Sequence, residues 1–261
     1  MFCEAEAMTK LRHPLPEQLD WLTCRIEQLI GPAAFLVRTE EDRNTKAGGL
    51  KTIAPVGGTF ISGCPDVPLG APWALSDWAG SNAYRRTPYE GEAFIAQLNL
   101  EDIPPDVLTH LPKVPRVGVV WVTADLDSDS DGWEGRAYFS PQCAKDTTWR
   151  ARETHRPETL PLAMNYVLAD TLPYASEKTL PEIAWDWQGQ CKDFDDWRDK
   201  YYGRKTAEIQ LGGWIHLVQG DCDEERETLV ASFGHLHFGD CGEVYLHYSV
   251  ERGFFVRLYT N

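Results

Sequence analysis

The feature that most constrains the fold is a series of short apolar runs rich in β-branched and aromatic residues. Glycine, proline or polar residues bound each run, and this pattern is typical of strands joined by turns. The runs are residues 94–100, 117–124, 212–218, 229–237, 244–250 and 254–259. Together with a helix near the N-terminus, they predict an α+β fold that is predominantly antiparallel β.

The N-terminal helix is predicted by apolar residues at helical spacing, with Pro16 at a position that suits the first turn. Gly31-Pro32 ends the helix, and residues 33–37 then read as a short buried strand. The residues that share the apolar helix face are Leu19, Leu22, Ile26 and Leu29.

A second short amphipathic helix is predicted over residues 193–202, where Phe194, Trp197 and Tyr201 recur at i, i+3 and i+4 spacing. Two other segments are dense in proline, and residues 55–73 are also dense in glycine. Closely spaced prolines exclude regular elements. We therefore expect ordered turns over residues 55–73 and irregular structure over residues 141–182.

The order of features recurs in two parts of the chain, although the spacings differ. A glycine-rich turn, an apolar strand and a Val/Tyr-rich strand occur within residues 52–140 and again within residues 205–261. This predicts a possible internal duplication of a β-rich unit. Residues 1–51 would supply a helix and strand leading into one compact domain over residues 52–261.

The chain has 261 residues and a formal net charge of −15, from 40 acidic and 25 basic residues. Such a charge repels phosphate backbones and anionic lipids, so neither nucleic acid nor a membrane is an expected partner. It attracts small cations or a basic protein, and it also serves solubility.

The seven cysteines are scattered without a C-x-x-C pair, so no zinc ribbon or thioredoxin-like site is signalled. The N-terminus lacks the pattern of a secretory signal, and no apolar run approaches the length of a membrane span. A cytoplasmic location with reduced thiols is expected. Met8 is an alternative start.

An ordered series of motifs resembles the DUF1963/YwqG-like family. The series comprises Gly63-Cys-Pro-Asp-Val-Pro-Leu-Gly-Ala-Pro-Trp73, the strand over residues 94–100, the run over residues 111–121 and Phe238-Gly-Asp-Cys-Gly242. The resemblance implies a β-rich α+β fold with a possible duplication, and it carries no catalytic residues. Some relatives are suspected to occur together with secreted polymorphic toxins. The resemblance therefore implies an immunity protein, in which an acidic chain would be the partner of such a toxin.

Glycine and proline within these motifs are predicted to shape turns. In the last motif the aspartate would cap backbone amides of a tight turn, and the final glycine would take a turn conformation. The predicted structural turn residues are Gly63, Pro65, Gly239, Asp240 and Gly242.

Alternating carboxylates at Asp127, Asp129 and Asp131, followed by Gly132, match the first positions of an EF-hand calcium loop. The bidentate acid required at the twelfth position falls on Tyr138. A solvated acidic hairpin tip is therefore favoured over a calcium site.

His235 and His237 would share one face of a strand, with Asp240 close behind. Imidazole and carboxylate suit zinc or iron, so these three residues are candidate metal ligands. A structural turn explains the same residues, and we expect neither a metal nor any other cofactor.

Four tryptophans in polar context, together with the aspartates of the acidic run, are candidate contacts for a basic partner. Alternatively, the tryptophans cover the edge of the core. The predicted partner-binding residues are Trp78, Asp127, Asp129, Asp131, Trp133, Trp185 and Trp187.

The chain contains no G-x-S-x-G elbow, P-loop, dinucleotide-binding glycine motif or H-E-x-x-H helix. The leading hypothesis is a non-enzymatic protein-binding protein, specifically an immunity protein that neutralises a basic toxin. A metal-dependent enzyme or metal sensor using His235, His237 and Asp240 is one alternative. A housekeeping scaffold is another.

Overall fold

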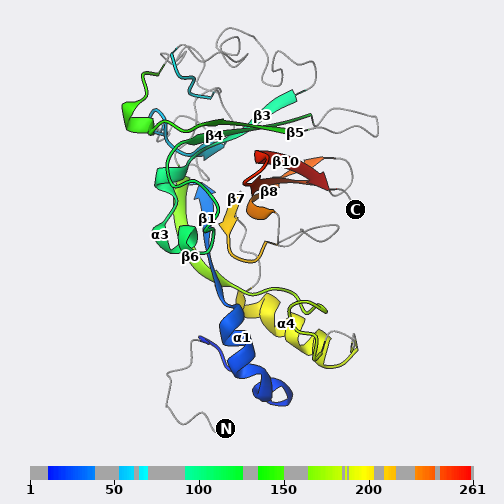
Figure 1. Cartoon of the computed structure of the whole chain (residues 1–261). Coiled ribbons are helices and arrows are strands. Elements are labelled where there is room, and N and C mark those ends of the chain that lie inside the picture. The colour runs from blue at the N-terminus through cyan, green and yellow to red at the C-terminus, as the bar shows by residue number, and fades with distance from the viewer. Residues whose placement is uncertain are drawn as a thin grey trace, which may run out of the picture.

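The computed structural model describes residues 11–38, 53–61, 65–69, 92–125, 135–149, 164–183, 186, 188–202, 209–215, 227–238 and 242–259. Figure 1 shows two β-sheets stacked above a helical end, which lies beside the N-terminus. The α+β fold, predominantly antiparallel β with an N-terminal helix, is as predicted. None of the described helices is long and apolar enough to cross a membrane.

The larger sheet has six strands in the order β10-β9-β8-β7-β1-β6, and neighbouring strands pair antiparallel. β1 pairs with β6 on one side and with β7 on the other, so the N-terminal part of the chain is built into this sheet. The strands are β1 (Gly31–Arg38), β6 (Met164–Thr171), β7 (Ile209–Gly212), β8 (Thr228–Phe238), β9 (Gly242–Ser249) and β10 (Gly253–Tyr259).

The smaller sheet is an antiparallel meander in the order β2-β3-β4-β5. Short helical elements lie between β3 and β4, and a further helical turn follows β5. The elements are β2 (Phe60–Ile61), β3 (Glu92–Asn99), η3 (Leu100–Asp102), α3 (Pro105–Thr109), β4 (Val119–Asp125), β5 (Gly135–Ser140) and η4 (Ala144–Asp146).

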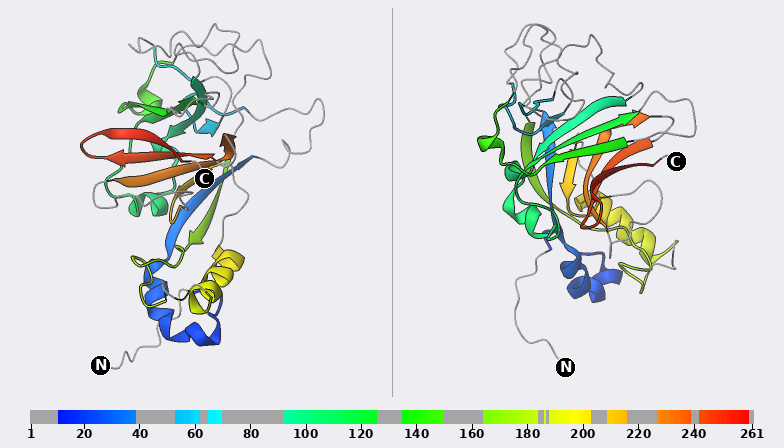
Figure 2. Two further views of the ribbon diagram at one scale, coloured as in Figure 1. Left: turned by 90° about the vertical axis from the view of Figure 1, so that its right-hand side faces the viewer. Right: turned by 45° about the horizontal axis from the view of Figure 1, so that its top comes forward.

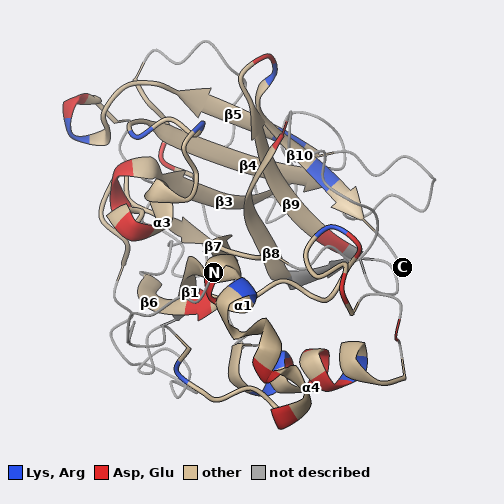
Figure 3. Ribbon diagram, turned by 60° about the horizontal axis from the view of Figure 1, so that its bottom comes forward, with Lys and Arg blue, Asp and Glu red and all other residues tan. Residues whose placement is uncertain are grey.

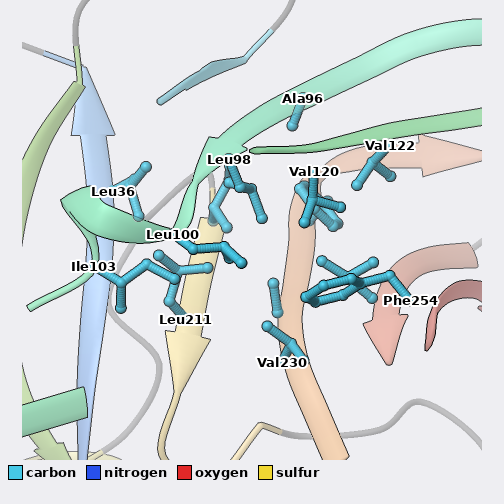
Figure 4. Packing of buried hydrophobic residues seen from close by; sticks show 14 of the residues in the cluster. Leu36, Ala96, Leu98, Leu100, Ile103, Val120, Val122, Leu211, Val230 and Phe254 are labelled. Carbon is cyan, nitrogen blue, oxygen red and sulfur yellow. The ribbon is translucent and has the colours of Figure 1, made fainter. Parts of the chain in front are cut away.

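The main core lies between the two sheets, because alternate residues of each strand point toward the other sheet. In β4, Val120 and Val122 face this core and are fully buried. Figure 4 shows them beside Phe254 and Val230 of the larger sheet. At one side of the sandwich β5 and β10 approach so closely that a Cβ atom on Gly135 would lie 2.3 Å from Cγ1 of Val256.

Each predicted half forms one four-stranded meander: β2–β5 make up the smaller sheet, and β7–β10 make up two thirds of the larger one. Both meanders carry an irregularity at the same place. The β3–β4 ladder skips Ile95 and the β8–β9 ladder skips Val230. Two residues later, Gln97 and Ser232 point away from the core at matched positions. These likenesses support the predicted duplication, which itself stays a prediction.

The helical end has a second core of its own. It is formed by η1 (Glu17–Leu22), α1 (Thr23–Leu29) and α4 (Gln190–Tyr202), which both views of Figure 2 place at the end of the molecule near the N-terminus. Leu19, Leu22 and Ile26 pack here with Phe194 and Trp197. Both predicted helices are confirmed, with the difference that the first begins as a 3-10 helix.

The expectation that residues 141–182 are irregular is wrong, because β6 lies within them. β6 is one of the two edge strands of the larger sheet among the described residues, and Val167 and Leu168 are exposed. An outer strand with little buried surface lacks the apolar alternation that marks a strand in sequence. Its pairing with β1, from Gly31 opposite Thr171 onward, is a tertiary effect.

Candidate functional site

A buried polar network lies on the outer face of the smaller sheet. Gln97 on β3 and Trp121 on β4 are opposite each other in the ladder, and both are fully buried. The Trp121 Nε1–H donates to Gln97 Oε1 at 2.9 Å and to the Asp66 carbonyl at 3.0 Å. The Gln97 side-chain amide in turn donates to the Gly58 carbonyl at 2.9 Å and to Asp66 Oδ2 at 3.1 Å.

Asp66 completes this network and is only 1% exposed. Its backbone N–H donates to Gln97 Oε1 at 2.9 Å, and its Oδ2 accepts the backbone N–H of Gly57 at 2.6 Å. Gly57 has φ 76°, and a Cβ atom there would lie 2.9 Å from the Trp149 ring. The network therefore fastens the glycine- and proline-rich segment to the sheet, because its buried polar atoms satisfy one another.

A neighbouring set of contacts continues the network toward η3. The backbone N–H and the hydroxyl of Thr59 donate to Asp102 Oδ2 at 3.0 and 3.1 Å, and the Asn99 N–H donates to Thr59 Oγ1 at 2.9 Å. Burial raises the pKa of Asp102, although the Thr59 hydrogen bonds act in the opposite direction. Burial also raises the pKa of Tyr166. These groups hold the fold together, and none of them lines either of the two cavities described below.

The candidate binding site is a cleft of about 570 Å³ where the helical end meets the larger sheet. The chain contributes to it from the end of α1, the segment after α3, the segment before α4, α4 itself, the turn after β7 and the start of β8. Its walls are largely apolar, with Leu29, Leu111, Pro112, Pro173, Trp214 and Leu229. Clefts of about 300–1,000 Å³ with such walls are typical small-molecule sites.

Trp214 is held in the cleft wall by its surroundings. Its indole N–H donates to the Leu29 carbonyl, and its backbone N–H donates to Thr171 Oγ1 at 2.8 Å. Gly212 and Gly213 precede it with φ 62° and 64°, a left-handed conformation that only glycine adopts readily. This double-glycine turn ends β7 and directs the tryptophan toward the helical end.

Arg198 and Tyr174 form the part of the cleft nearest α4. The Arg198 side chain is 5% exposed, and its Cζ lies 3.8 Å from the centroid of the Tyr174 ring. Its Nε–H donates to the Leu172 carbonyl at 2.9 Å, and its Nη1 pairs with Asp199. Burial raises the pKa of Tyr174, so this phenol is neutral at pH 7.

Three cationic side chains line the cleft: Lys113, Lys178 and Arg198. The one lining carboxylate, Glu227, is held from outside the cleft, since its Oε1 lies 2.5 Å from Nη2 of Arg257. Its charge is therefore already balanced by an arginine. Arg198 is likewise paired, with Asp199, so the lining brings three cations and one carboxylate together in a chain whose formal net charge is −15.

His247 lies beside Glu227 without adding charge to this region. Its ring is fully buried, stacks on Phe255 with the centroids 5.4 Å apart, and has Nδ1 3.9 Å from Glu227 Oε2. Burial, together with Arg257 and Arg252, lowers the pKa of His247 to about 4. The imidazole is therefore neutral at pH 7.

A smaller cavity of about 60 Å³ lies behind the cleft, and Tyr174, Arg198 and Trp214 line both. Polar groups of the larger sheet complete it, including Gln210 and Ser232. Ser232 is the residue that matches Gln97 of the smaller sheet. The buried network around Gln97 therefore covers the outer face of the β2–β5 meander. The wall of the cleft covers the corresponding face of the β7–β10 meander at Ser232.

The sequence profile described as "Domain of unknown function (DUF1963)" matches residues 59–249, which is well over half of the chain. The chain belongs to the DUF1963 family. This confirms the predicted resemblance to DUF1963. A search of curated proteins finds no match.

Three of the motifs that carry the DUF1963 resemblance supply Asp66, Gln97 and Trp121 to the buried network. The motif over residues 111–121 also supplies Leu111, Pro112 and Lys113 to the cleft.

Pro65, predicted as a turn residue, is buried at the start of the described segment 65–69. Gly242 is the first residue of β9 and pairs with Phe238. Gly63, Gly239 and Asp240 lie outside the described residues.

The other predicted site residues of this DUF1963 protein are only partly placed. His235 and His237 are in β8, where alternate positions share a face, but their side chains are outside the described part. Within the described residues no group of three or more His, Cys, Asp and Glu is placed to hold a metal ion. The residues outside the described ranges are Trp78, Asp127, Asp129, Asp131, Trp133, Trp185 and Trp187.

Sequence reasoning missed the cleft. Lys113, Tyr174, Lys178 and Arg198 come from three separate segments, and nothing in the chain marks them as neighbours. One local signal exists: two consecutive glycines precede Trp214, and glycine is the residue that favours a turn with positive φ.

Proposed function

We propose that this DUF1963 protein is a non-enzymatic binding protein and that the cleft is its ligand-binding site. The observation that carries the proposal is the composition of the cleft. It combines apolar and aromatic walls with Lys113, Lys178 and Arg198, in a chain that is acidic as a whole. Charge of the opposite sign concentrated in a concave apolar site is typical of ligand recognition.

The rigidity of the walls supports binding. Trp214 is fixed by hydrogen bonds to Leu29 and Thr171, and Tyr174 is fixed by the Arg198 guanidinium on its ring. A ligand then meets surfaces that are already in place, so little conformational entropy is lost on binding.

Three polar lining residues, Ser176, Thr179 and Glu227, make contacts that stabilise the fold. This supports a role in binding and not in catalysis. The Ser176 hydroxyl and the Thr179 hydroxyl are 2.8 Å apart, and the Thr179 N–H donates to Ser176 Oγ at 3.2 Å, which closes a local turn. The Glu227 carboxylate is held by Arg257. Such groups are tied to structure instead of being poised for proton transfer.

Ligand-observed NMR with a fragment library tests the proposal. Fragments are expected to bind the wild type and to lose binding in Trp214→Ala. Trp21→Ala is the matched control, because Trp21 is 58% exposed on η1 and does not line the cleft. Binding that is equal in the wild type and both variants, or catalytic turnover of any fragment, would contradict the proposal.

The immunity-protein hypothesis is a second candidate, and the surface of the helical end favours it. Trp21 stands exposed beside Glu17 and Asp20, and Gln18 ties η1 to Asp193 of α4 with a 2.7 Å hydrogen bond. Figure 3 shows further acidic residues along α4. Exposed aromatic and acidic side chains suit a basic protein partner.

A pull-down from the source cell at low and high salt tests this second candidate. A single basic protein that is retained at low salt and lost on Trp21→Ala is the expected result for an immunity protein. Retention of a partner that is neither basic nor toxic would instead favour the housekeeping scaffold.

A further inference from the structure

We propose that the ligand of the cleft carries an uncharged amide edge, in which an N–H donor lies next to a C=O acceptor, and that Gln210 and Ser232 recognise this edge in the small cavity behind the cleft. This rests on the proposed function and adds the chemical class of the ligand. The placement of the two residues, the hydrogen bonds that they leave unmade and the charge of the cavity each restrict that class.

Gln210 and Ser232 lie side by side on the outer face of the larger sheet. They are direct partners in the β7–β8 ladder, so their Cβ atoms are about 5 Å apart and their side chains leave the same face. The two residues are 6% and 2% exposed, and both line the cavity of about 60 Å³. A group in this cavity therefore meets both side chains at once.

Both side chains keep hydrogen-bonding capacity for a ligand. Gln210 Nε2 donates to the carbonyls of Gly212 and Trp214 at 3.2 and 3.0 Å, which leaves Oε1 as the amide atom that can serve the cavity. Within the part of the chain that the structure describes, Oε1 accepts no hydrogen bond and the Ser232 hydroxyl makes none. Buried polar groups normally have partners, so both oxygens call for one.

Gln97, the buried glutamine of the smaller sheet, shows how the protein satisfies such a side chain when it supplies the partners itself. Its Oε1 accepts from the Trp121 indole and from the Asp66 N–H. Beside Gln210 there is instead a cavity large enough for one small polar group. A ligand group in this cavity makes the hydrogen bonds for Gln210 that the chain makes for Gln97.

The two oxygens select a donor and an acceptor that lie together. Gln210 Oε1 requires an N–H or O–H donor, and the Ser232 hydroxyl can donate to a carbonyl oxygen. An amide edge supplies both from one planar group. A carboxylate has no proton to donate, so it would set one of its oxygens against Gln210 Oε1.

The cavity also favours a neutral group. Its one charged lining residue, Arg198, is already paired with Asp199. A charged group would therefore be buried without a free partner of opposite charge, which is costly. Trp214 lines the cavity as well as the cleft, so a ligand whose amide edge enters the cavity keeps its body against the indole and the apolar walls.

Isothermal titration calorimetry with three naphthalene probes of nearly equal shape tests the inference. 2-Naphthamide has the amide edge, 2-acetylnaphthalene has a methyl group in place of the NH2 group, and 2-naphthoate has a charged oxygen there. We expect the amide to bind about tenfold more tightly than the ketone, because the ketone leaves Gln210 Oε1 without a donor. The carboxylate should bind no better than the ketone.

Two variants assign the preference to its residues. In Gln210→Leu the acceptor is gone, so the amide should bind no better than the ketone. Ser232→Ala should weaken the amide and the ketone alike, by about fivefold, because both carbonyls lose the same donor. Ser140→Ala is the matched control, since Ser140 is on β5 and lines neither the cleft nor the cavity. It should bind all three probes as the wild type does.

Circular dichroism checks that each variant is folded. The Ser232 hydroxyl makes no hydrogen bond with the described residues that the fold would lose, so Ser232→Ala decides the test if Gln210→Leu does not fold. An amide affinity that is unchanged in Ser232→Ala, or an amide preference that survives in Gln210→Leu, would overturn the inference.

The remaining outcomes separate the inference from the proposed function. Equal affinity for the amide and the ketone, or tighter binding of the carboxylate, would remove recognition of an amide edge. If that binding is lost in Trp214→Ala, the cleft remains a binding site. Binding of none of the probes would also overturn the inference, and the proposed function would fall with it only if no fragment binds in a manner that depends on Trp214.

Discussion

Arg198 and Tyr174 stack, with the guanidinium carbon 3.8 Å from the ring centroid, at the junction between the helical end and the larger sheet. The same guanidinium donates to the carbonyl of Leu172, the residue that follows β6, and pairs with Asp199. One side chain of α4 thus joins the helical core to the sheet. It also forms part of the cleft that we propose as the binding site.

Replacing Arg198 should destabilise the protein substantially. Arg198→Ala removes a buried hydrogen bond to Leu172 and the stack on Tyr174, so we expect a loss of about 2–4 kcal/mol in the free energy of unfolding. Urea denaturation followed by circular dichroism measures it. Lys200→Ala, at an exposed position on the same helix, should change stability by less than about 0.5 kcal/mol. A similar small change in Arg198→Ala would show that the junction does not depend on this side chain.

Replacing Gln97 should test the buried network. Gln97→Leu keeps the approximate volume but leaves the Trp121 indole N–H and the Asp66 N–H with fewer acceptors. Buried polar groups without partners cost about 1–3 kcal/mol each, so unfolding free energy should fall by about 2–4 kcal/mol. Thermal unfolding measures the change. An unaltered midpoint would mean that the network contributes nothing net, and Thr109→Ala at an exposed position is the control.

His247 should make stability fall in mild acid. The pKa of its imidazole is lowered from 6.5 to about 4 in the folded state by burial and by Arg257 and Arg252. The unfolded chain therefore takes up the proton first as pH falls, and stability is lost between about pH 6.5 and pH 4. Its contribution is fully present above pH 6.5 and reaches at most about 3 kcal/mol.

Urea denaturation of the wild type and His247→Gln at pH 7.5 and pH 4.5 isolates this effect. The raised carboxyl pKa of Asp102 has the opposite sign, because the folded state then holds its proton more readily, but it is common to both proteins. The wild type should lose more stability than the variant over this interval. Equal losses would show that His247 titrates normally.

Two glycines with the same backbone conformation should respond differently to alanine. Gly213 and Gly253 have φ 64° and 72°. A Cβ atom on Gly213 would lie 2.3 Å from Thr171 Oγ1, whereas one on Gly253 would have nothing within 4 Å. Gly253→Ala should cost about 1 kcal/mol of backbone strain, and Gly213→Ala should cost about 2–4 kcal/mol because of the added clash.

Thermal unfolding of the two glycine variants checks this difference, and titration with a fragment that binds the wild type adds a functional readout. Gly213→Ala should also weaken fragment binding, because Gly213 directs Trp214 into the cleft wall. If both variants lose the same stability, the close approach to Thr171 is not a constraint.

The metal alternative has its own test. We expect elemental analysis of gently purified protein to find less than one equivalent of zinc or iron per chain. Stoichiometric metal that disappears in His237→Ala would favour the metal-dependent enzyme or sensor, with His235 and Asp240 as further ligands. Asn165→Ala, at an exposed position on β6, serves as the control for handling losses.

The local sequence alone predicted those helices and strands whose hydrophobic pattern lies within one short stretch of consecutive residues. The apolar spacing of residues 193–202 predicts α4, and β-branched runs predict β3, β4, β8, β9 and β10. These patterns are readable because a helix face or a strand face buried against one core must repeat with the period of the element. The family motifs were also readable, since they sit in contiguous stretches of chain.

Other features were decided only by tertiary structure. β6 carries no clear strand pattern because few of its residues are buried, and its place depends on β1, more than 120 residues earlier. Gln97 and Asp66 could be read as motif residues, but their mutual hydrogen bonds required the folded loop. The cleft is the extreme case. Its walls and charges come from segments between Gln28 and Leu229, so only the packing of the helical end against the larger sheet brings them together.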